Sequence, residues 1–368
     1  MWKTTDGTTG RLIQLCLGYF FFYLIFGTTV KYFTDYLVQQ MSDPATFKAM
    51  QVRMNMEFLV YSTMGGNLIC LFIVLVFRWY KLKSNYSIQA AGVKFPVEFL
   101  YIVPSGIMTA VIIPTTTLMF TLPISIMVAM VIMRGSIIVI SRLVDAIQIK
   151  QKILKRKVYI QEEIAVLFAI LAVSVHLFYD RGNSSFDFIT YTPAMIILGS
   201  YLVAYSIRLY IMNYYKNTRG KGVPQDNKGF FAIEQISAGI TVLIVGFILF
   251  NISEPESYQV KLFQEALTQP TYLWGWEIIA GTVFGVVAFF SVFLFMFKGR
   301  TATFAGLVNR LTSLIAGTGA TLVFYYIFGG KFPKNSDWIS LGFILVAVVF
   351  LTIAEKRRTA ELKAEHVI

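Results

Sequence analysis

The stretch "VAMVIMRGSIIVISRL" (residues 128–143) places one arginine, Arg134, inside a run of residues that otherwise suits hydrocarbon. Apolar runs of about 18 to 25 residues, long enough to cross a bilayer as α-helices, recur along the whole chain. The chain is 56% hydrophobic and only 14% charged over 368 residues. This pattern predicts an all-α, multi-pass integral membrane protein without a soluble domain.

Apolar runs bounded by charge, Gly or Pro predict ten transmembrane helices. Their expected ranges are 11–31, 55–78, 98–118, 122–143, 161–179, 190–213, 230–251, 272–297, 301–328 and 336–354. The first run is too long and too aromatic for a cleaved signal peptide, so we expect it to be retained. The polar tail, 355–368, is a candidate extension of the tenth helix.

The basic residues outside these spans are concentrated in the amino terminus, the even-numbered loops and the tail. By the positive-inside rule, this bias predicts that both termini and the basic loop 150–157 are cytoplasmic, in a plasma or inner membrane or in an organelle membrane. The same bias explains the net charge of +12, so we expect no nucleic-acid binding. In a long outward loop, Val260, Phe263, Ala266 and Leu267 recur at helical intervals and predict a short amphipathic helix.

Few residues suited to catalysis or metal binding are present. Cys16 and Cys70 both lie in apolar runs, which is typical of small core residues rather than of a disulfide or a metal site. The chain has two histidines and no pair of carboxylates at a useful spacing, so it lacks the polar cluster that a membrane-embedded enzyme needs. We therefore expect no enzyme activity, no cofactor and no metal.

Five spans followed by five more indicate an internal repeat, and several landmarks recur in order in the two halves. Because five is odd, the halves would have opposite orientations in the membrane, as in many transporters. We expect one five-helix repeat over 1–180 and an inverted one over 181–368. The recurring residues are Glu57 and Glu234, Glu98 and Glu277, and Arg134 and Arg310.

The two arginines lie deep in their spans, Arg134 about 16 Å and Arg310 about 14 Å from the helix start at the standard rise. A charge near the bilayer centre costs about 2.5 to 3.5 kcal/mol on insertion scales, so each should face a polar cavity or a partner. No acidic residue falls in the middle of a span, and Asp145 is expected to pair with Arg142. An anionic substrate would balance the arginines, because guanidinium binds two oxygens of a phosphate or carboxylate. The alternative is structural bonding to helix carbonyls.

Further polar residues are candidates for the same site. Lys31 closes the first span and reaches either inward to a cavity or outward to water. Tyr61 is expected to stack on a base or sugar, and Ser136 lies beside Arg134 in the "MRGS" stretch. Arg208 lies near the cytoplasmic end of its span and is expected to extend to the surface as a structural residue.

Longer passages resemble a known family. Residues 129–173, with a basic stretch between the fourth and fifth spans, resemble the drug/metabolite transporter superfamily. Residues 301–351 are similar to the ninth and tenth helices of that superfamily, and "FGTTVK" (26–31) is similar to its first-helix pattern. The resemblance covers nearly the whole chain and implies ten helices and transport by alternating access.

The stretch "GLVNR" (306–310) is similar to the Gly-Ala-Leu-Asn-Lys motif of nucleotide-sugar transporters. By that resemblance, Asn309 would hydrogen-bond a base or ribose, and Arg310, in place of lysine, would meet a phosphate. A companion motif in the seventh helix, an aromatic pair followed by two asparagines, is not matched at residues 230–233. The "MRGS" stretch is also similar to the branch that carries drugs and small metabolites.

The sequence therefore predicts a secondary active transporter that moves a small anionic metabolite, such as a nucleotide sugar or another phosphate ester, by alternating access. The alternative is a proton-coupled exporter of amino acids, drugs or other neutral or cationic metabolites that depends on Glu57, Glu98 or His176. Expected partners are the small-molecule substrate and membrane lipids, with a homodimer left open. The predicted substrate contacts are Arg134, Arg310, Asn309, Lys31, Tyr61 and Ser136.

Overall fold

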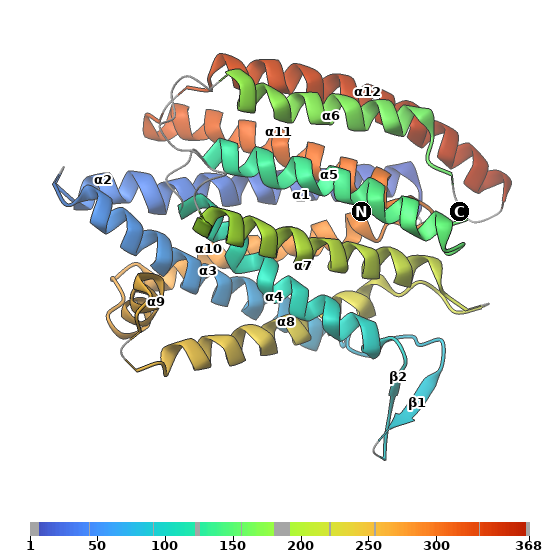
Figure 1. Cartoon of the computed structure of the whole chain (residues 1–368), viewed down its shortest axis with the longest axis horizontal. Helices are drawn as coiled ribbons and strands as arrows, with labels where there is room; N and C mark the ends of the chain where they lie inside the picture. Colours follow the sequence, from blue (N-terminus) through green and yellow to red (C-terminus); the bar gives the residue numbers. More distant parts are fainter. Residues whose placement is uncertain are drawn as a thin grey trace.

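The computed structural model describes residues 7–43, 45–90, 92–121, 126–155, 157–179, 192–220, 222–253, 255–330 and 332–365. Long helices run alternately in opposite directions and form one elongated bundle (Figure 1). In these residues, eight helical segments are long and apolar enough to cross a membrane. The prediction of an all-α integral membrane protein is confirmed at this level.

Each of the ten predicted spans overlaps a long helix. The long helices are α1 (Thr9–Lys31), α3 (Phe47–Val76), α4 (Phe99–Thr121), α5 (Ile126–Lys150), α6 (Ile160–Tyr179), α7 (Thr192–Asn217), α8 (Asn227–Phe250), α10 (Trp274–Phe295), α11 (Ala302–Phe328) and α12 (Asn335–Ala364). Helices α5 and α6 fall outside the eight segments that meet the membrane criterion. The polar tail continues α12 as far as Ala364, so its predicted helical extension is confirmed. The predicted repeat boundary at 180/181 lies outside the described residues.

Short elements connect the long helices. A π-helical turn, η1 (Tyr32–Tyr36), and α2 (Leu37–Met41) continue α1. Helix α9 (Tyr258–Thr268) is the predicted amphipathic helix, and its Leu262 and Ala266 are buried against apolar side chains of α3. An antiparallel hairpin, β1 (Ser87–Ala90) and β2 (Val93–Pro96), lies where we expected only a loop.

The two ends of the bundle differ in what they carry. The labels N and C lie at the same end as the β1–β2 hairpin, whereas α2 and α9 lie at the opposite end (Figure 1). The Thr9 hydroxyl, at the start of α1, donates a hydrogen bond to Glu355 of α12 over 3.0 Å. We call these the terminal end and the distal end.

Helix packing brings segments from both halves of the chain together. Helix α1 packs against α10 and α11, α3 against α10, and α4 against α7 and α8. Helix α5 packs against α6, α7 and α11, and α12 runs along α6. One large cluster of buried apolar side chains links most of these helices. The interior is therefore formed where α1, α5, α7, α10 and α11 face one another.

Candidate functional site

Two buried arginines meet in this interior. Arg134 of α5 is 5% exposed and Arg310 of α11 is 6% exposed. Arg134 Nη1 donates a hydrogen bond to the hydroxyl of Ser313, and that hydroxyl donates to the backbone carbonyl of Arg310 over 2.8 Å. Arg134 thus contacts α11 one helical turn from Arg310, and both charges lie at one level of the bundle.

Tyrosine rings from α1 and α7 surround the two guanidinium groups. Arg134 Nη2 donates to the Tyr23 hydroxyl, and its guanidinium carbon lies 4.9 Å from the centre of the Tyr23 ring. The guanidinium carbon of Arg310 lies 4.7 Å from the Tyr205 ring centre. Tyr19 and Tyr201 are also within electrostatic range of Arg310. We call these two arginines and four tyrosines the arginine–tyrosine cluster.

Asn309 lies next to the cluster and is fully buried. Its Nδ2 donates to Ser291 Oγ of α10 over 3.0 Å, and its Oδ1 accepts a long hydrogen bond of 3.5 Å from the Tyr19 hydroxyl. The amide is therefore held between α1 and α10 beside Arg310. Sequence reasoning placed Asn309 and Arg310 correctly side by side, since they are neighbours in the chain.

The arginines keep donors without acceptors. Nε and Nη2 of Arg310 and Nε of Arg134 are buried and have no hydrogen-bond partner within the described part of the chain. Among the described residues, no carboxylate forms an ion pair with either side chain. Each aromatic ring over a cation contributes about 0.5 to 2 kcal/mol, whereas burying an ion costs several kcal/mol. The cluster therefore carries positive charge that the tyrosines do not fully offset, which favours binding of an anion.

Asp145 fastens α5, the helix of Arg134, to the start of α11, the helix of Arg310. Its carboxylate accepts hydrogen bonds from the backbone N–H of Ala302 (2.9 Å) and of Thr303 (2.6 Å) at the start of α11. A helix N-terminus offers free N–H groups and a positive dipole end, which attract a buried carboxylate. The predicted pair between Asp145 and Arg142 is wrong, because Arg142 binds the exposed Glu163 at 2.6 Å instead.

Arg208 does not extend to the surface as predicted. Its Nε and Nη2 each donate to one oxygen of Glu234 on α8, both over 2.9 Å, and Ser105 of α4 donates to the same carboxylate over 2.7 Å. Both charged side chains are buried. The reason is that α7 and α8 converge on α4, so a bidentate partner lies closer to the guanidinium than bulk water does.

The structure does not bring three of the predicted contacts to the cluster. Lys31 donates to Thr321, which lies about 16 Å along α11 from Arg310 at 1.5 Å per residue. Tyr61 packs 5.9 Å from the Trp274 ring, and Trp274 lies about 25 Å along α10 from Ser291, the partner of Asn309. Ser136 is half-buried and lies about 200° around α5 from Arg134, on another face of that helix. The side chain of His176 lies outside the described part of the chain.

Sequence reasoning missed the tyrosines, although a signal was available. Tyr19 and Tyr23 are four residues apart on α1, and Tyr201 and Tyr205 are four apart on α7, so each pair lies on one helix face. A polar tip on one face of an apolar helix indicates an interior polar partner. That partner became visible only once α1 and α7 were seen to pack beside α11 and α5.

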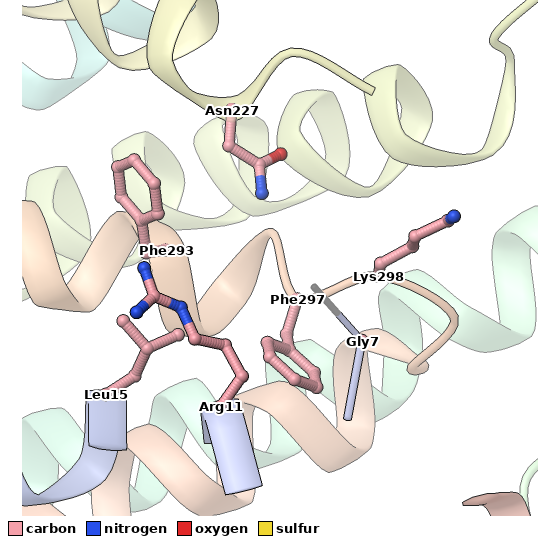
Figure 2. A pocket seen from close by; sticks show the side chains of 7 residues that line it. All are labelled: Gly7, Arg11, Leu15, Asn227, Phe293, Phe297 and Lys298. Carbon is pink, nitrogen blue, oxygen red and sulfur yellow. The ribbon is translucent and has the colours of Figure 1, made fainter. Parts of the chain in front are cut away.

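A recess at the terminal end is too small for a metabolite. It is lined by Gly7, Arg11, Leu15, Asn227, Phe293, Phe297 and Lys298. Figure 2 shows Arg11 extending toward Phe293, while the Lys298 side chain points away from the other residues. The volume of the recess is about 20 Å³, which is enough for about one water molecule. We therefore treat the recess as a packing feature of the bundle.

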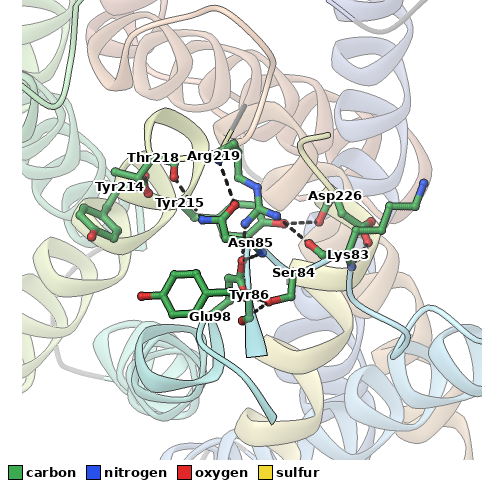
Figure 3. Close-up of polar contacts among 11 residues, drawn as sticks. Lys83, Ser84, Asn85, Tyr86, Glu98, Tyr214, Tyr215, Thr218, Arg219 and Asp226 are labelled. Carbon is green, nitrogen blue, oxygen red and sulfur yellow. Dashed lines mark hydrogen bonds and ion pairs between the residues drawn. The ribbon is translucent and has the colours of Figure 1, made fainter. Parts of the chain in front are cut away.

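Also at the terminal end, a polar network joins the β1–β2 region to the α7–α8 connection (Figure 3). Glu98 accepts hydrogen bonds from Ser84 Oγ (2.5 Å), the Asn85 N–H (2.7 Å) and Arg219 Nη1 (2.8 Å). Burial acts to raise the pKa of the Glu98 carboxyl, but these donors outweigh it and hold the pKa below the ordinary value. Because the Glu98 carboxylate accepts all three of these hydrogen bonds, its role is to hold the α3–α4 connection, which contains β1 and β2, against the α7–α8 connection.

Comparisons with known proteins find a similar fold but no family and no related protein of known function. No family model matches the chain. No curated protein matches it either. A solved structure described only as "Crystal structure of protein" is similar over 95% of this chain and 99% of that chain, with a TM-score of 0.57 at 12% sequence identity. At this identity the likeness concerns the fold alone, and the fold and composition define the class: a multi-helix integral membrane protein.

Proposed function

We propose that the protein is a secondary active transporter that moves a small anionic metabolite across a membrane by alternating access. One observation carries the proposal. Arg134 and Arg310 meet in the interior with buried donors that lack acceptors, and no carboxylate in the described residues balances them. An anionic ligand bound between the helices would supply both the charge and the acceptors.

We also propose ten membrane spans arranged as two inverted repeats, and the packing partners support this arrangement. The first repeat would comprise α1, α3, α4, α5 and α6, and the second α7, α8, α10, α11 and α12. Exchanging the equivalent helices turns the α3–α10 contact into α8–α4, α1–α10 into α7–α4, and α1–α11 into α7–α5, all of which are observed. The α5–α11 and α6–α12 contacts would then lie on the two-fold axis.

The contacts of the arginine–tyrosine cluster also agree with the exchange of equivalent helices between the two proposed repeats. Arg134 of α5 stacks on Tyr23 of α1, and Arg310 of α11 stacks on Tyr205 of α7, at 4.9 and 4.7 Å. Under the proposed repeat these are equivalent pairs of helices. Transporters built from inverted repeats bind their substrates at the interface between the repeats, and under the proposed arrangement this cluster would lie at that interface.

The charge of the site favours an anionic over a cationic cargo. Two guanidinium groups without carboxylate partners repel a cation, so the exporter alternative is left with neutral metabolites. The resemblance of residues 306–310 to the motif of nucleotide-sugar transporters supports a phosphate ester, with Arg310 as its main contact. Asn309 already bonds Ser291 and Tyr19, so its contact with a base or sugar would require one of those bonds to open.

The test is a thermal-shift screen of the purified protein against nucleotides, nucleotide sugars, sugar phosphates, inorganic phosphate and neutral amino acids. A ligand of the folded state raises the melting temperature by mass action. We expect a phosphate-containing anion to do so, and Arg310→Gln to weaken its affinity about 10- to 100-fold, since a hydrogen bond to a charged group contributes about 1.5 to 3 kcal/mol. Uptake of that anion into liposomes should fall in parallel.

The matched control is Arg142→Gln, which removes a partly exposed arginine from α5, the helix of Arg134, and should leave the affinity unchanged. An anion that binds wild type, Arg134→Gln and Arg310→Gln equally well would contradict the proposed site. A neutral amino acid that stabilises the protein when no anion does would favour the exporter alternative.

A further inference from the structure

A pair of buried glutamates lies away from the arginine–tyrosine cluster, toward the distal end. Glu57 of α3 and Glu277 of α10 are both 0% exposed and are within electrostatic range of each other. The two helices touch through their backbones next to Glu277, at Ile278 of α10 and Gly65 of α3, which lies two helical turns from Glu57. A Cβ on Gly65 would lie 1.9 Å from the carbonyl oxygen of Ile278, so there is no space for water between the helices at that point.

The two carboxyl groups differ in their hydrogen bonds. Glu57 Oε1 accepts from the backbone N–H of Thr271 over 2.7 Å and from its hydroxyl over 2.6 Å. Glu57 Oε2 and both oxygens of Glu277 are buried and have no hydrogen-bond partner among the residues that the structure describes. Two donors stabilise a negative charge on Glu57. A buried carboxyl group with no donor at all, such as that of Glu277, is stable only when it is neutral.

Nearby charged and titratable groups do not compensate the pair. In the part of the chain that the structure describes, no cation forms an ion pair with either glutamate. The surrounding groups on α3, α9, η1 and α1 are engaged elsewhere or exposed. Three of these groups donate hydrogen bonds elsewhere: Arg53 to the Gln269 carbonyl, Tyr61 to the Ala266 carbonyl and Lys31 to Thr321. Asp35 accepts a hydrogen bond from Gln51. Lys261 and Glu265 are exposed.

We propose that Glu57 and Glu277 hold one exchangeable proton between them, carried on Glu277, and form a proton-binding site separate from the arginine–tyrosine cluster. Two ionised carboxylates that are both buried and within electrostatic range of each other would repel each other. Glu277 lies in the first turn of α10, where the helix dipole favours a negative charge. That effect is smaller than the cost of burying an ion without donors, so the neutral form prevails.

The consequence for transport rests on the proposed function. Helices α3 and α10 would belong to different repeats, and loss of the proton would place two like charges in their contact. The proton would therefore stabilise one arrangement of the repeats over the other, which is how a proton gradient biases a conformational equilibrium.

Infrared difference spectroscopy of the purified full-length protein over a range of pH tests the site directly. Wild type should show the carbonyl band of a protonated carboxylic acid at neutral pH that disappears, as one proton, on alkaline titration. Glu277→Gln, which resembles the neutral acid in shape, should lack this band. Glu57→Gln removes the neighbouring negative charge, so the band should disappear at lower pH than in wild type. Glu163→Gln, a partly exposed glutamate paired with Arg142, is the control and should behave as wild type.

Three results would overturn the proposal: no such band in wild type, a band that Glu277→Gln retains, or a band that persists at every pH at which the protein stays folded. A fourth would be loss of the band when sodium chloride replaces choline chloride, since the site would then bind a metal cation. The spectra require no substrate. Anion binding that both arginine variants leave unchanged, together with the expected band, would contradict the proposed anion site and leave the proton site standing. Anion binding that depends on the arginines, without the band, would do the reverse.

Discussion

At the scale of single residues, the buried charges fall into two groups. Arg208 has a bidentate partner in Glu234, which also accepts a hydrogen bond from Ser105. The opposite charges of Arg208 and Glu234 therefore balance each other. Arg134 and Arg310 are contacted by hydroxyls and aromatic rings, and no described carboxylate pairs with them. The first arrangement is typical of structural ion pairs, and the second is the one expected of a site that meets an anion.

The ion pair between Arg208 and Glu234 predicts that a single substitution destabilises the protein much more than a substitution of both residues. Glu234→Gln leaves Arg208 buried without a counter-charge and should lower the free energy of unfolding by about 3 to 5 kcal/mol. Replacing both residues with methionine should recover most of that loss, because no charge is then left buried. Equilibrium unfolding in detergent micelles measures both, with Glu163→Gln as an exposed control that should cost less than about 1 kcal/mol. If the double variant were as unstable as the single one, the instability would not come from an unbalanced buried charge on Arg208.

Sequence reasoning found one of these two groups and not the other. A deep arginine is visible in an apolar run whatever its neighbours are, so Arg134 and Arg310 could be singled out. The partner of Arg208 could not, because Glu234 lies on a different helix and near its start, where the pattern indicated a boundary residue. Only the approach of α7, α8 and α4 brings the two charges together.

At the scale of elements, the contact between α3 and α10 depends on glycine. A Cβ on Gly65 would meet the Ile278 carbonyl at 1.9 Å, and one on Gly281 would meet the Ser62 carbonyl at 2.1 Å. Both obstacles are backbone atoms, which cannot turn aside as a side chain can. The small residues therefore allow the close approach of the two helices next to Glu277.

Gly65→Ala should accordingly force α3 and α10 apart and lower the free energy of unfolding by about 1 to 3 kcal/mol. Gly199→Ala is the matched control, because Gly199 lies inside α7 with nothing within 4 Å of the added Cβ. That change should be neutral or stabilising by up to about 1 kcal/mol, since alanine favours helix over glycine. Equal effects at the two positions would show that the contact is looser than the structure indicates. Thermal unfolding in micelles separates the two outcomes.

At the scale of the whole molecule, the start of α1 and the late part of α12 lie together at the terminal end (Figure 1). The charge bias predicts that this end is cytoplasmic. A cysteine introduced at the exposed Lys155 should then react with a membrane-impermeant thiol reagent only from the cytoplasmic side. One introduced at the exposed Gln259 of α9 should react only from the other side. If both cysteines were labelled from the same side of intact cells, the prediction that the two ends of the bundle lie on opposite sides of the membrane would be refuted.

By itself, the sequence determined the apolar runs, the amphipathic helix α9, the basic bias and the two deep arginines. Each of these is a property of one local window, and hydrophobicity and charge in such a window decide whether it can cross a bilayer. The tertiary structure alone decided the partners: Asp145 at the start of α11, Glu234 on Arg208, four tyrosines around the arginines, and Tyr61 and Lys31 far from them. Contacts between helices depend on which faces pack together and at what level, and no local window of sequence contains that information.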